Sequence, residues 1–190
     1  MLKYLYIILL IFITIDGFSQ FKYEKEVRIK ENAVPANARS FVDSMNFNSK
    51  IKWYKEIGKI NISYEAKTKY NGKRFSIEFS EDGTFEDVEI EIAPKDIPVV
   101  TFRKIEEFIK SEYDRYSIEK VQIQYSGNPE SVRAKLQERV VTDAIGIHFE
   151  IVISTKLDGA FRMFEYLFSE AGDFVRKDMI IEKSIDNIIY

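Results

Sequence analysis

Two stretches of this chain repeat one pattern: "NGKRFSIEFSEDGTF" at residues 71–85 and "DGAFRMFEYLFSEAGDF" at residues 158–174. Each begins with a polar residue followed by Gly, continues as an alternating aromatic run, and ends in Phe-Ser-Glu-x-Gly-x-Phe. A polar residue before Gly, flanked by alternating apolar residues, is the strongest short signal for a β-hairpin. The repeat therefore predicts two equivalent hairpins in one chain.

A predicted helix precedes each hairpin. Residues 34–45 place Ala38, Phe41, Val42 and Met45 on one helical face, with Pro35 at the start. Residues 96–113 place Phe102, Ile105 and Ile109 on one face, with Asp96 as the expected N-cap. Alternating strands follow each helix, at 51–57, 59–70, 73–79 and 85–92, then at 118–125, 144–154, 161–168 and 174–181.

These elements predict an α+β protein built as a tandem repeat of a helix plus four antiparallel strands. A unit of about 75 residues buries little apolar surface alone. We therefore expect the two units to form one continuous sheet, with both helices on one face and the other face open. The predicted segments are a leader at 20–33 (an extended tail or a short edge strand), a first repeat at 34–95, and a second repeat at 96–190 carrying an insert at 126–144.

Residues 1–19 have the pattern of a signal peptide. Lys3 precedes an apolar run at 4–15, and the small residues Gly17 and Ser19 stand just before Gln20. A retained membrane anchor is the alternative, but the run is shorter than the roughly 20 residues that span a bilayer. The chain has no Cys, which excludes a lipid-modified Cys at the N-terminus. We expect an exported protein of the periplasm or extracellular space, with no stable membrane insertion after the signal is removed.

The charge balance points away from polyanionic partners. The net charge is −3, and removal of residues 1–19, which carry Lys3 and Asp16, leaves it unchanged. Nucleic acids and anionic membranes are bound through an excess of basic residues. We therefore expect no nucleic-acid partner.

A set of turn and core residues forms a pattern typical of a known family: Val34-Pro35, Lys52-Trp53, Asn71-Gly72-Lys73, Phe75–Phe79 and Glu81-Asp82-Gly83. With these residues the chain after the signal peptide, closely in the first repeat and loosely in the second, resembles the PepSY-like, beta-lactamase-inhibitor-like family of exported bacterial proteins. The resemblance implies a two-repeat fold with a concave sheet, and non-enzymatic modules that bind proteins or peptides. The chain departs from the inhibitors of that fold because it has no Cys and only a tight turn at residues 71–72. No inhibitory residue is carried over.

No catalytic constellation is visible, so we predict that the protein is not an enzyme. His148 is the only histidine and falls on a polar strand face, and the chain has no Cys. We therefore expect no zinc site and no Cys/His or Ser/His catalytic pair. Glu89 and Glu91 alternate with apolar residues, which favours a solvated strand face over a weak cation site. We expect no cofactor and no metal, and we expect Trp53 to pack in the core.

One strand face differs between the two repeats. Opposite the expected core residues, the first returning strand carries Arg74, Ser76 and Glu78, whereas the second carries Met163, Glu165 and Leu167. A large apolar face is seldom left exposed to solvent, so we expect another segment of the chain or a partner to cover it. Either the insert covers it, through Val132, Leu136, Val140 and Val141, or a partner does. The candidate partner or ligand face comprises Val152, Phe161, Met163, Leu167 and Ile180.

The sequence therefore leaves two classes of function. The first is an exported binding module, inhibitor-like in type, that recognises an envelope protein or peptide through the open sheet face. The second is a carrier of a small apolar ligand, or a structural envelope protein. Self-association through the same face is a further outcome of either class.

We predict that the mature protein begins at Gln20 or within two residues of it, because the small residues that precede Gln20 suit signal-peptide cleavage. Mass spectrometry of the protein from its own host tests this. Intact protein that retains residues 1–19 in the membrane fraction would contradict the prediction.

Overall fold

The structure is a computed structural model that describes residues 20–22, 25–58, 61–141 and 143–181. The predicted signal peptide at 1–19 lies outside the described residues. Within them, no helix is long and apolar enough to cross a membrane.

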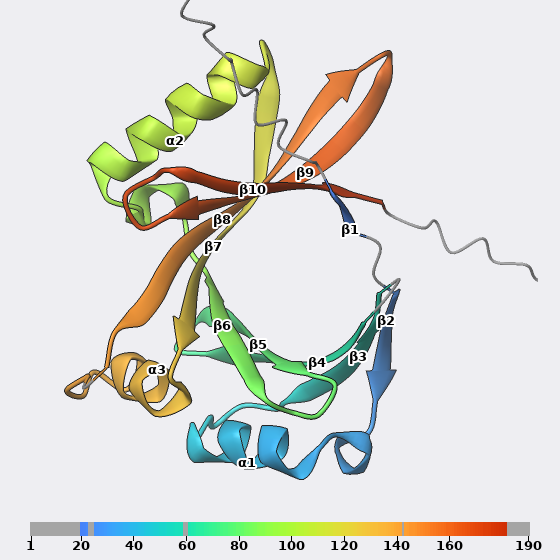
Figure 1. The fold of residues 1–190 in the computed structure, drawn as a ribbon, viewed down its shortest axis with the longest axis vertical. Helices are drawn as coiled ribbons and strands as arrows, with labels where there is room; N and C mark the ends of the chain where they lie inside the picture. Colours follow the sequence, from blue (N-terminus) through green and yellow to red (C-terminus); the bar gives the residue numbers. More distant parts are fainter. Residues whose placement is uncertain (1–19, 23–24, 59–60, 142, 182–190) are drawn as a thin grey trace, which may run out of the picture.

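The described chain forms one ten-stranded sheet with its helices on one side (Figure 1). The strand order is β1-β10-β9-β8-β7-β6-β5-β4-β3-β2, and every pair is antiparallel except β1 with β10. The predicted α+β fold with a repeated helix-plus-strands plan is confirmed. The first unit contains α1 (Ala36–Ser44), β3 (Lys52–Ile57), β4 (Ile62–Tyr70), β5 (Lys73–Ser80) and β6 (Phe85–Glu91). The second contains α2 (Val99–Glu112), β7 (Tyr116–Gly127), α3 (Pro129–Leu136), β8 (Ile145–Leu157), β9 (Ala160–Ser169) and β10 (Phe174–Ile180).

Both predicted hairpins are present. Asn71 and Gly72 join β4 to β5 with φ angles of 49° and 80°, and Asp158 and Gly159 join β8 to β9 with φ angles of 51° and 82°. Two consecutive positive φ angles define the two-residue turn whose twist matches that of paired strands. Asn, Asp and Gly tolerate this backbone, which explains why the same turn chemistry occurs twice.

The start of the second helix differs from the prediction. Helix α2 begins after Pro98, and the Asp96 carboxylate instead accepts a hydrogen bond from the Ala93 backbone N–H at 3.0 Å. This bond closes a short 3-10 turn at Pro94–Asp96. Because the residue before a proline is pushed out of the helical region, Ile97 is extended and separates the turn from the helix.

The apolar core lies between the sheet and the helices. In the second unit, Ile105 and Ile109 of α2 pack on Tyr166 and Phe168 of β9. In the first unit, Ala38 and Val42 of α1 pack with Trp53 and Phe79, as the sequence predicted for Trp53. Ile92 and Ile123 contact both clusters, so the two cores are continuous. Alternate apolar residues of both returning strands face this core: Phe75, Ile77 and Phe79, and Phe164, Tyr166 and Phe168.

One polar network links α2 to the strands beneath it. The hydroxyl of Tyr166 donates to the Glu112 carboxylate and lies 2.9 Å from the Tyr113 hydroxyl. Burial and these hydrogen bonds raise the pKa of Tyr166 far above its ordinary value. Lys177 of β10 pairs with Glu112 at 2.9 Å and lies over the Phe164 ring at 4.8 Å. The buried hydroxyl of Tyr166 therefore has its hydrogen-bond partners within the protein.

The insert lies on the same side of the sheet as α1 and α2. Val132 of α3 is fully buried and Leu136 partly buried in the first-unit core, together with Tyr125 and Ile145. The Asn128 side chain caps the helix by accepting from the Glu130 and Ser131 backbone N–H groups. Tyr125 and Ile145, which flank the insert, lie on the helix side of the sheet, and α3 packs against them on that side. The hypothesis that the insert covers the opposite face is wrong.

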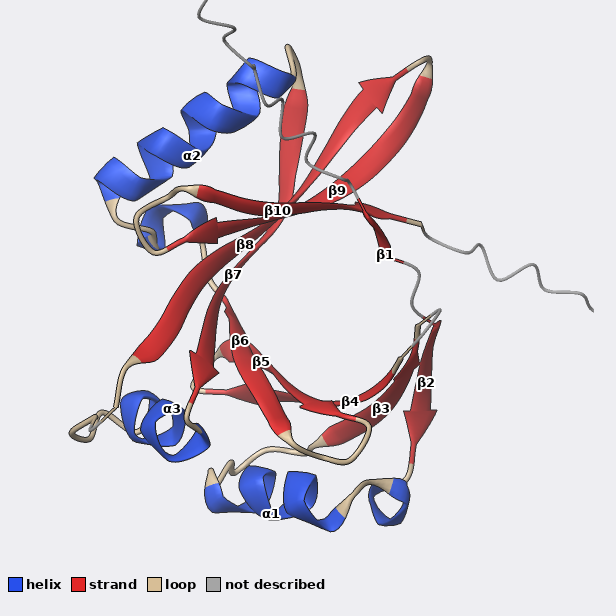
Figure 2. Ribbon diagram, viewed as in Figure 1, coloured by secondary structure: helices blue, strands red, loops and turns tan. Residues whose placement is uncertain are grey.

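The sheet is strongly curved, and the helices cover its outer side (Figure 2). The leader contributes strands at both ends of this curve: β2 (Lys25–Ile29) pairs with β3, and β1 (Gln20–Lys22) pairs in parallel with β10. An edge strand was one of the two predicted states of the leader, and β2 is such a strand. The pairing of β1 with the far edge was not predicted, because parallel pairing between distant segments leaves no local signal.

Truncation of Phe168 to Ala is expected to lower the free energy of unfolding by about 3–5 kcal/mol, since a fully buried aromatic side chain leaves a cavity. Urea denaturation followed by circular dichroism measures the change. The control is Phe161→Ala, in the same strand but 77% exposed, for which we expect a change within about 0.5 kcal/mol. A loss for Phe161→Ala as large as that for Phe168→Ala, or larger, would contradict the assignment of Phe168 to the core face of β9.

Candidate functional site

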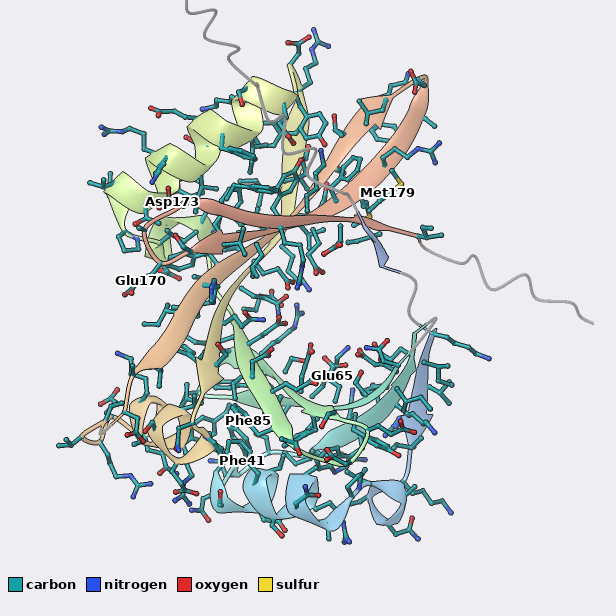
Figure 3. The ribbon with its side chains drawn as sticks, in the orientation of Figure 1. Phe41, Glu65, Phe85, Glu170, Asp173 and Met179 are labelled. Carbon is teal, nitrogen blue, oxygen red and sulfur yellow. The ribbon has the colours of Figure 1, made fainter. Side chains whose placement is uncertain are left out.

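The concave side of the sheet, opposite the helices, forms a groove of about 680 Å³ that we call the concave groove (Figure 3). Glu56 of β3 and Glu165 of β9 both line it, although their strands are six steps apart, or about 29 Å along the sheet. The curvature therefore brings the two repeats to face each other. Charged and amide residues dominate the lining: Lys50, Lys52, Glu56, Glu65, Lys67, Lys69, Arg74, Glu78, Glu89, Glu91, Lys120, Gln122, Glu150 and Glu165.

Buried carboxylates form the floor of this face. The exposed fractions are 4% for Glu65, 7% for Glu89, 3% for Glu150, 5% for Glu165 and 6% for Asp178. The prediction of a solvated acidic face is therefore wrong for Glu89. Strand alternation correctly placed Glu89 opposite the core, but the burial comes from the bend of the sheet, which alternation does not encode.

In the first repeat, Lys67 forms an ion pair with the buried Glu65. Lys67 Nζ lies 2.8 Å from Glu65 and 2.8 Å from Glu26 of β2, and the Ser76 hydroxyl donates to Glu65. Burial by itself would lower the pKa of Lys67, but the Glu65 and Glu26 carboxylates outweigh it and raise the pKa above the ordinary 10.5. Lys67 is therefore charged across the physiological range.

In the middle of the sheet, side-chain amides in place of lysines donate hydrogen bonds to the carboxylates. Gln122 of β7 donates to Glu89 at 2.8 Å, and Gln124 donates to Asp87 at 3.2 Å. At the rim, Arg74 pairs with Glu91 at 2.9 Å. Amide donors satisfy carboxylate lone pairs without adding charge, so this part of the groove remains acidic.

Among the residues that the structure describes, two groups of three carboxylates are close enough to hold a cation. Their oxygens lie within 4.8 Å of one another in Glu26, Glu56 and Glu65, and in Glu78, Asp87 and Glu89. Lys67 already bridges two acids of the first group, and Gln122 and Gln124 donate to two of the second. Side chains of the protein thus already donate to carboxylates in both groups, at the oxygens that a cation would otherwise bind.

In the second repeat, Arg176 of β10 bridges two acids. Its guanidinium lies 2.7 Å from Asp178 and 3.9 Å from Glu165, while Lys120 lies 3.7 Å from Glu150. In three of these ion pairs, Lys67–Glu65, Lys120–Glu150 and Arg176–Asp178, the acid is buried and the side chain of the base is 40–50% exposed. The acids Glu26 and Glu91 differ, because their side chains are 41% and 38% exposed.

The five candidate residues all lie on the concave face but in different surroundings. Val152 is 4% exposed and is paired in register with Lys120 and Glu165. Leu167 is 8% exposed and is paired with Glu150 and Arg176. These two are buried among charges instead of forming a bare apolar surface.

The other three candidates lie toward the end of the β8–β9–β10 region. Met163 and Ile180 are neighbours in register and are partly buried. Phe161 is 77% exposed, opposite Lys156 near the tip of the β8–β9 hairpin. Met163, Ile180 and Phe161 therefore form an apolar area on the concave face, outside the lining of the groove.

The sequence did not single out the buried acids Glu65, Glu150 and Asp178. The sequence does place acidic residues at the non-core positions of consecutive strands. Such positions are usually exposed to solvent, so the pattern by itself did not indicate burial. His148 does lie on this face, as predicted, and is half-buried in register with Gln124 and Ser169.

Comparisons with known proteins agree with this architecture. No protein-family model matches the chain, and no curated protein is significantly similar to it. A DUF2874 family protein from Bacteroides ovatus has a similar structure, with a TM-score of 0.51, 13% identity, and coverage of 82% of this chain and 93% of the other. Weaker likenesses are a BLIP-like protein from Bacteroides fragilis (0.48, 15%, 81% and 92%) and a Bacteroides eggerthii protein provisionally described as periplasmic (0.49, 14%, 77% and 88%).

The first of these likenesses establishes a shared fold. The chain shares the fold of this DUF2874 family protein, and the resemblance predicted from the sequence is confirmed as a likeness of fold. At 13% identity, the likeness assigns no function to individual side chains.

Replacing Lys67 by Met is expected to lower the free energy of unfolding by about 1–3 kcal/mol at pH 7, because Glu65 is left buried without its cation. The pKa of Lys67 is raised in the folded chain. The contribution of the pair is therefore complete below the ordinary value of 10.5 and is lost only as the pH rises through the folded value. Urea denaturation at pH 7 thus measures it in full.

The matched control is Lys69→Met, on the same strand and face but exposed, where we expect a change within about 0.5 kcal/mol. Adding Glu65→Met to Lys67→Met should recover part of the loss, because the uncompensated charge is then removed. Indistinguishable stabilities for the two lysine variants would show that Lys67 does not stabilise the buried acid.

Proposed function

We propose that the protein is an exported, non-enzymatic binding module that holds a segment of a protein partner in the concave groove. The observation that carries this proposal is that both repeats line one groove, with Glu56 and Glu165 on opposite walls. A groove open along the sheet accommodates an extended chain, whereas enclosed cavities suit small molecules.

The chemistry of the floor favours a peptide over a small apolar ligand. Glu65, Glu89 and Glu150 are buried there with their present donors. An apolar ligand would remove water from these carboxylates without supplying hydrogen bonds, which costs several kcal/mol per group. A peptide brings backbone N–H groups and basic side chains that compensate for the lost water.

The arrangement of charge also describes the partner. The deep acids favour basic side chains and N–H donors, and the bases at the rim, among them Lys120 and Arg74, favour acidic neighbours. Beside the groove, on the same face of the sheet, Met163, Ile180 and Phe161 offer apolar contact, with the large exposed Phe161 as the anchor. We expect an extended segment with a basic and an apolar part, supplied by a protein of the periplasm or extracellular space.

Site-specific photo-crosslinking in the native host tests the proposal. A benzophenone amino acid replaces Phe161 in one variant and Val100 in another; Val100 is 80% exposed at the start of α2, on the helix side. We expect a discrete protein adduct from position 161 and none of the same mass from position 100. Adding Met163→Glu should lower the yield at position 161 about tenfold by placing a charge in the apolar contact.

Further outcomes decide between the alternatives. An adduct of twice the monomer mass at position 161 would identify the partner as a second copy of this chain. Equal adducts from both positions, or a yield unaffected by Met163→Glu, would contradict binding through this face.

A further inference from the structure

Three exposed lysines line one end of the concave groove, near the turn between β4 and β5. Lys52 is the first residue of β3, and Lys69 is the last but one of β4. Lys50 lies just before β3, and its backbone carbonyl accepts a hydrogen bond from the Thr68 hydroxyl at 3.3 Å, which holds this segment beside β4. We call Lys50, Lys52 and Lys69 the lysine end of the groove.

The strand register places like charges opposite one another at the lysine end. Lys52 is in register with Lys67 on β4, and Lys69 is in register with Arg74 on β5. Like charges directly opposite each other on neighbouring strands destabilise a sheet. An anion bound at this end would offset the repulsion.

The charges of the lysine end are not taken up by acids of the protein. The two cations opposite them have acidic partners: Lys67 lies 2.8 Å from Glu65. Arg74 lies 2.9 Å from Glu91. The lysine end, in contrast, forms no ion pair with any acid that the structure describes. A carboxylate that enters the groove here therefore meets cations without displacing another acid.

One row of residues leads from the lysine end to the acidic floor. Its members all line the groove and lie on consecutive strands from β4 to β8: Lys69, Arg74, Glu91, Gln122 and Glu150. Register or an ion pair joins each member to the next. The lining thus changes from basic to acidic over four strand steps, or about 19 Å along the sheet.

We propose that the lysine end binds the carboxylate of an acidic side chain in the partner segment and so fixes the direction of that segment in the groove. The inference rests on the proposed function, because the segment is the one held in the concave groove. An extended peptide advances about 3.3 Å per residue, so the distance of about 19 Å corresponds to about six residues. The acidic residue of the segment therefore stands about six residues from the basic residue that lies over Glu150.

The acidic floor argues against a polyanion as the occupant. A polyanion that extended beyond the lysine end would bring its charges against Glu89 and Glu150, which are 7% and 3% exposed. Like charges that meet in an interface cost several kcal/mol. A peptide segment with separated acidic and basic residues matches both parts of the groove.

NMR of the isotope-labelled protein, produced in its host from the full chain, tests the proposal. The probe is the acetylated and amidated peptide Glu-Glu-Ser-Gly-Ser-Ser-Lys-Lys, and the control peptide Glu-Lys-Ser-Glu-Gly-Lys-Ser-Ser has the same composition with its charges mixed. We expect the probe to shift the amide signals of residues 49–52 and 67–69, and to bind about fivefold more tightly than the control. This localisation does not depend on the folding of any variant.

A pair of double variants tests the lysines themselves. Lys52→Gln with Lys69→Gln should weaken binding of the probe about tenfold, because each exposed charge contact contributes a few-fold. Lys73→Gln with Lys95→Gln is the matched control: it removes the same charge at two exposed positions outside the lining of the groove. We expect this control to bind the probe as the unsubstituted protein does. Equal weakening in both double variants would mean that only the net charge matters, and would overturn the proposal.

The remaining outcomes separate this site from the proposed function. Sulfate at the same ionic strength is the third probe, and shifts as large as those of the peptide would identify a general anion site and contradict recognition of a segment. Probe peptide that leaves the signals of residues 49–52 unmoved would also overturn the inference, while a protein adduct from position 161 would still support the binding face. Shifts at the lysine end without such an adduct would support the carboxylate site and count against the proposed function.

Discussion

The pairing of β6 with β7 is the interaction on which the rest of the structure depends. Five register pairs, from Asp87 with Ser126 to Glu91 with Gln122, join the two repeats into one sheet. On the helix side, Ile92 and Ile123 belong to both core clusters. On the concave side, Gln122 donates to Glu89 across the same junction. Without this seam, each repeat would have to fold on a core of about 75 residues, which is marginal without disulfides.

The same seam determines the chemistry of the groove. Because the sheet is continuous and bends, non-core positions of distant strands face one another and lose contact with water. Glu65 and Glu150 are then buried and need nearby cations, which Lys67 and Lys120 supply from the rim. Such pairs contribute less to stability than well-packed apolar residues would. The acidic floor of the groove and the apolar residues around Met163 thus lie on one face of the sheet.

Much of the candidate site could be predicted from strand alternation, and the remainder could not. Alternation placed Met163, Leu167 and Ile180 on one face because side chains alternate along any strand. It could not distinguish the exposed Phe161 from the buried Val152, since burial depends on the bend of the sheet and on neighbouring strands. The insert was misplaced for a similar reason: its apolar residues fit either face, and only Tyr125 and Ile145 direct Val132 to the helix side.

The sequence by itself determined the local structure and the repeat. Asn71-Gly72 and Asp158-Gly159 require positive φ angles, aromatic alternation defines the core face, and Pro35 and Pro98 precede the two main helices. These features act over a few residues, so the chain encodes them directly. Only the tertiary structure decided the curvature, the burial of Glu89 and Asp178, and the parallel pairing of β1 with β10. Each of these depends on segments far apart in the chain, whose contacts form only when the whole sheet is assembled.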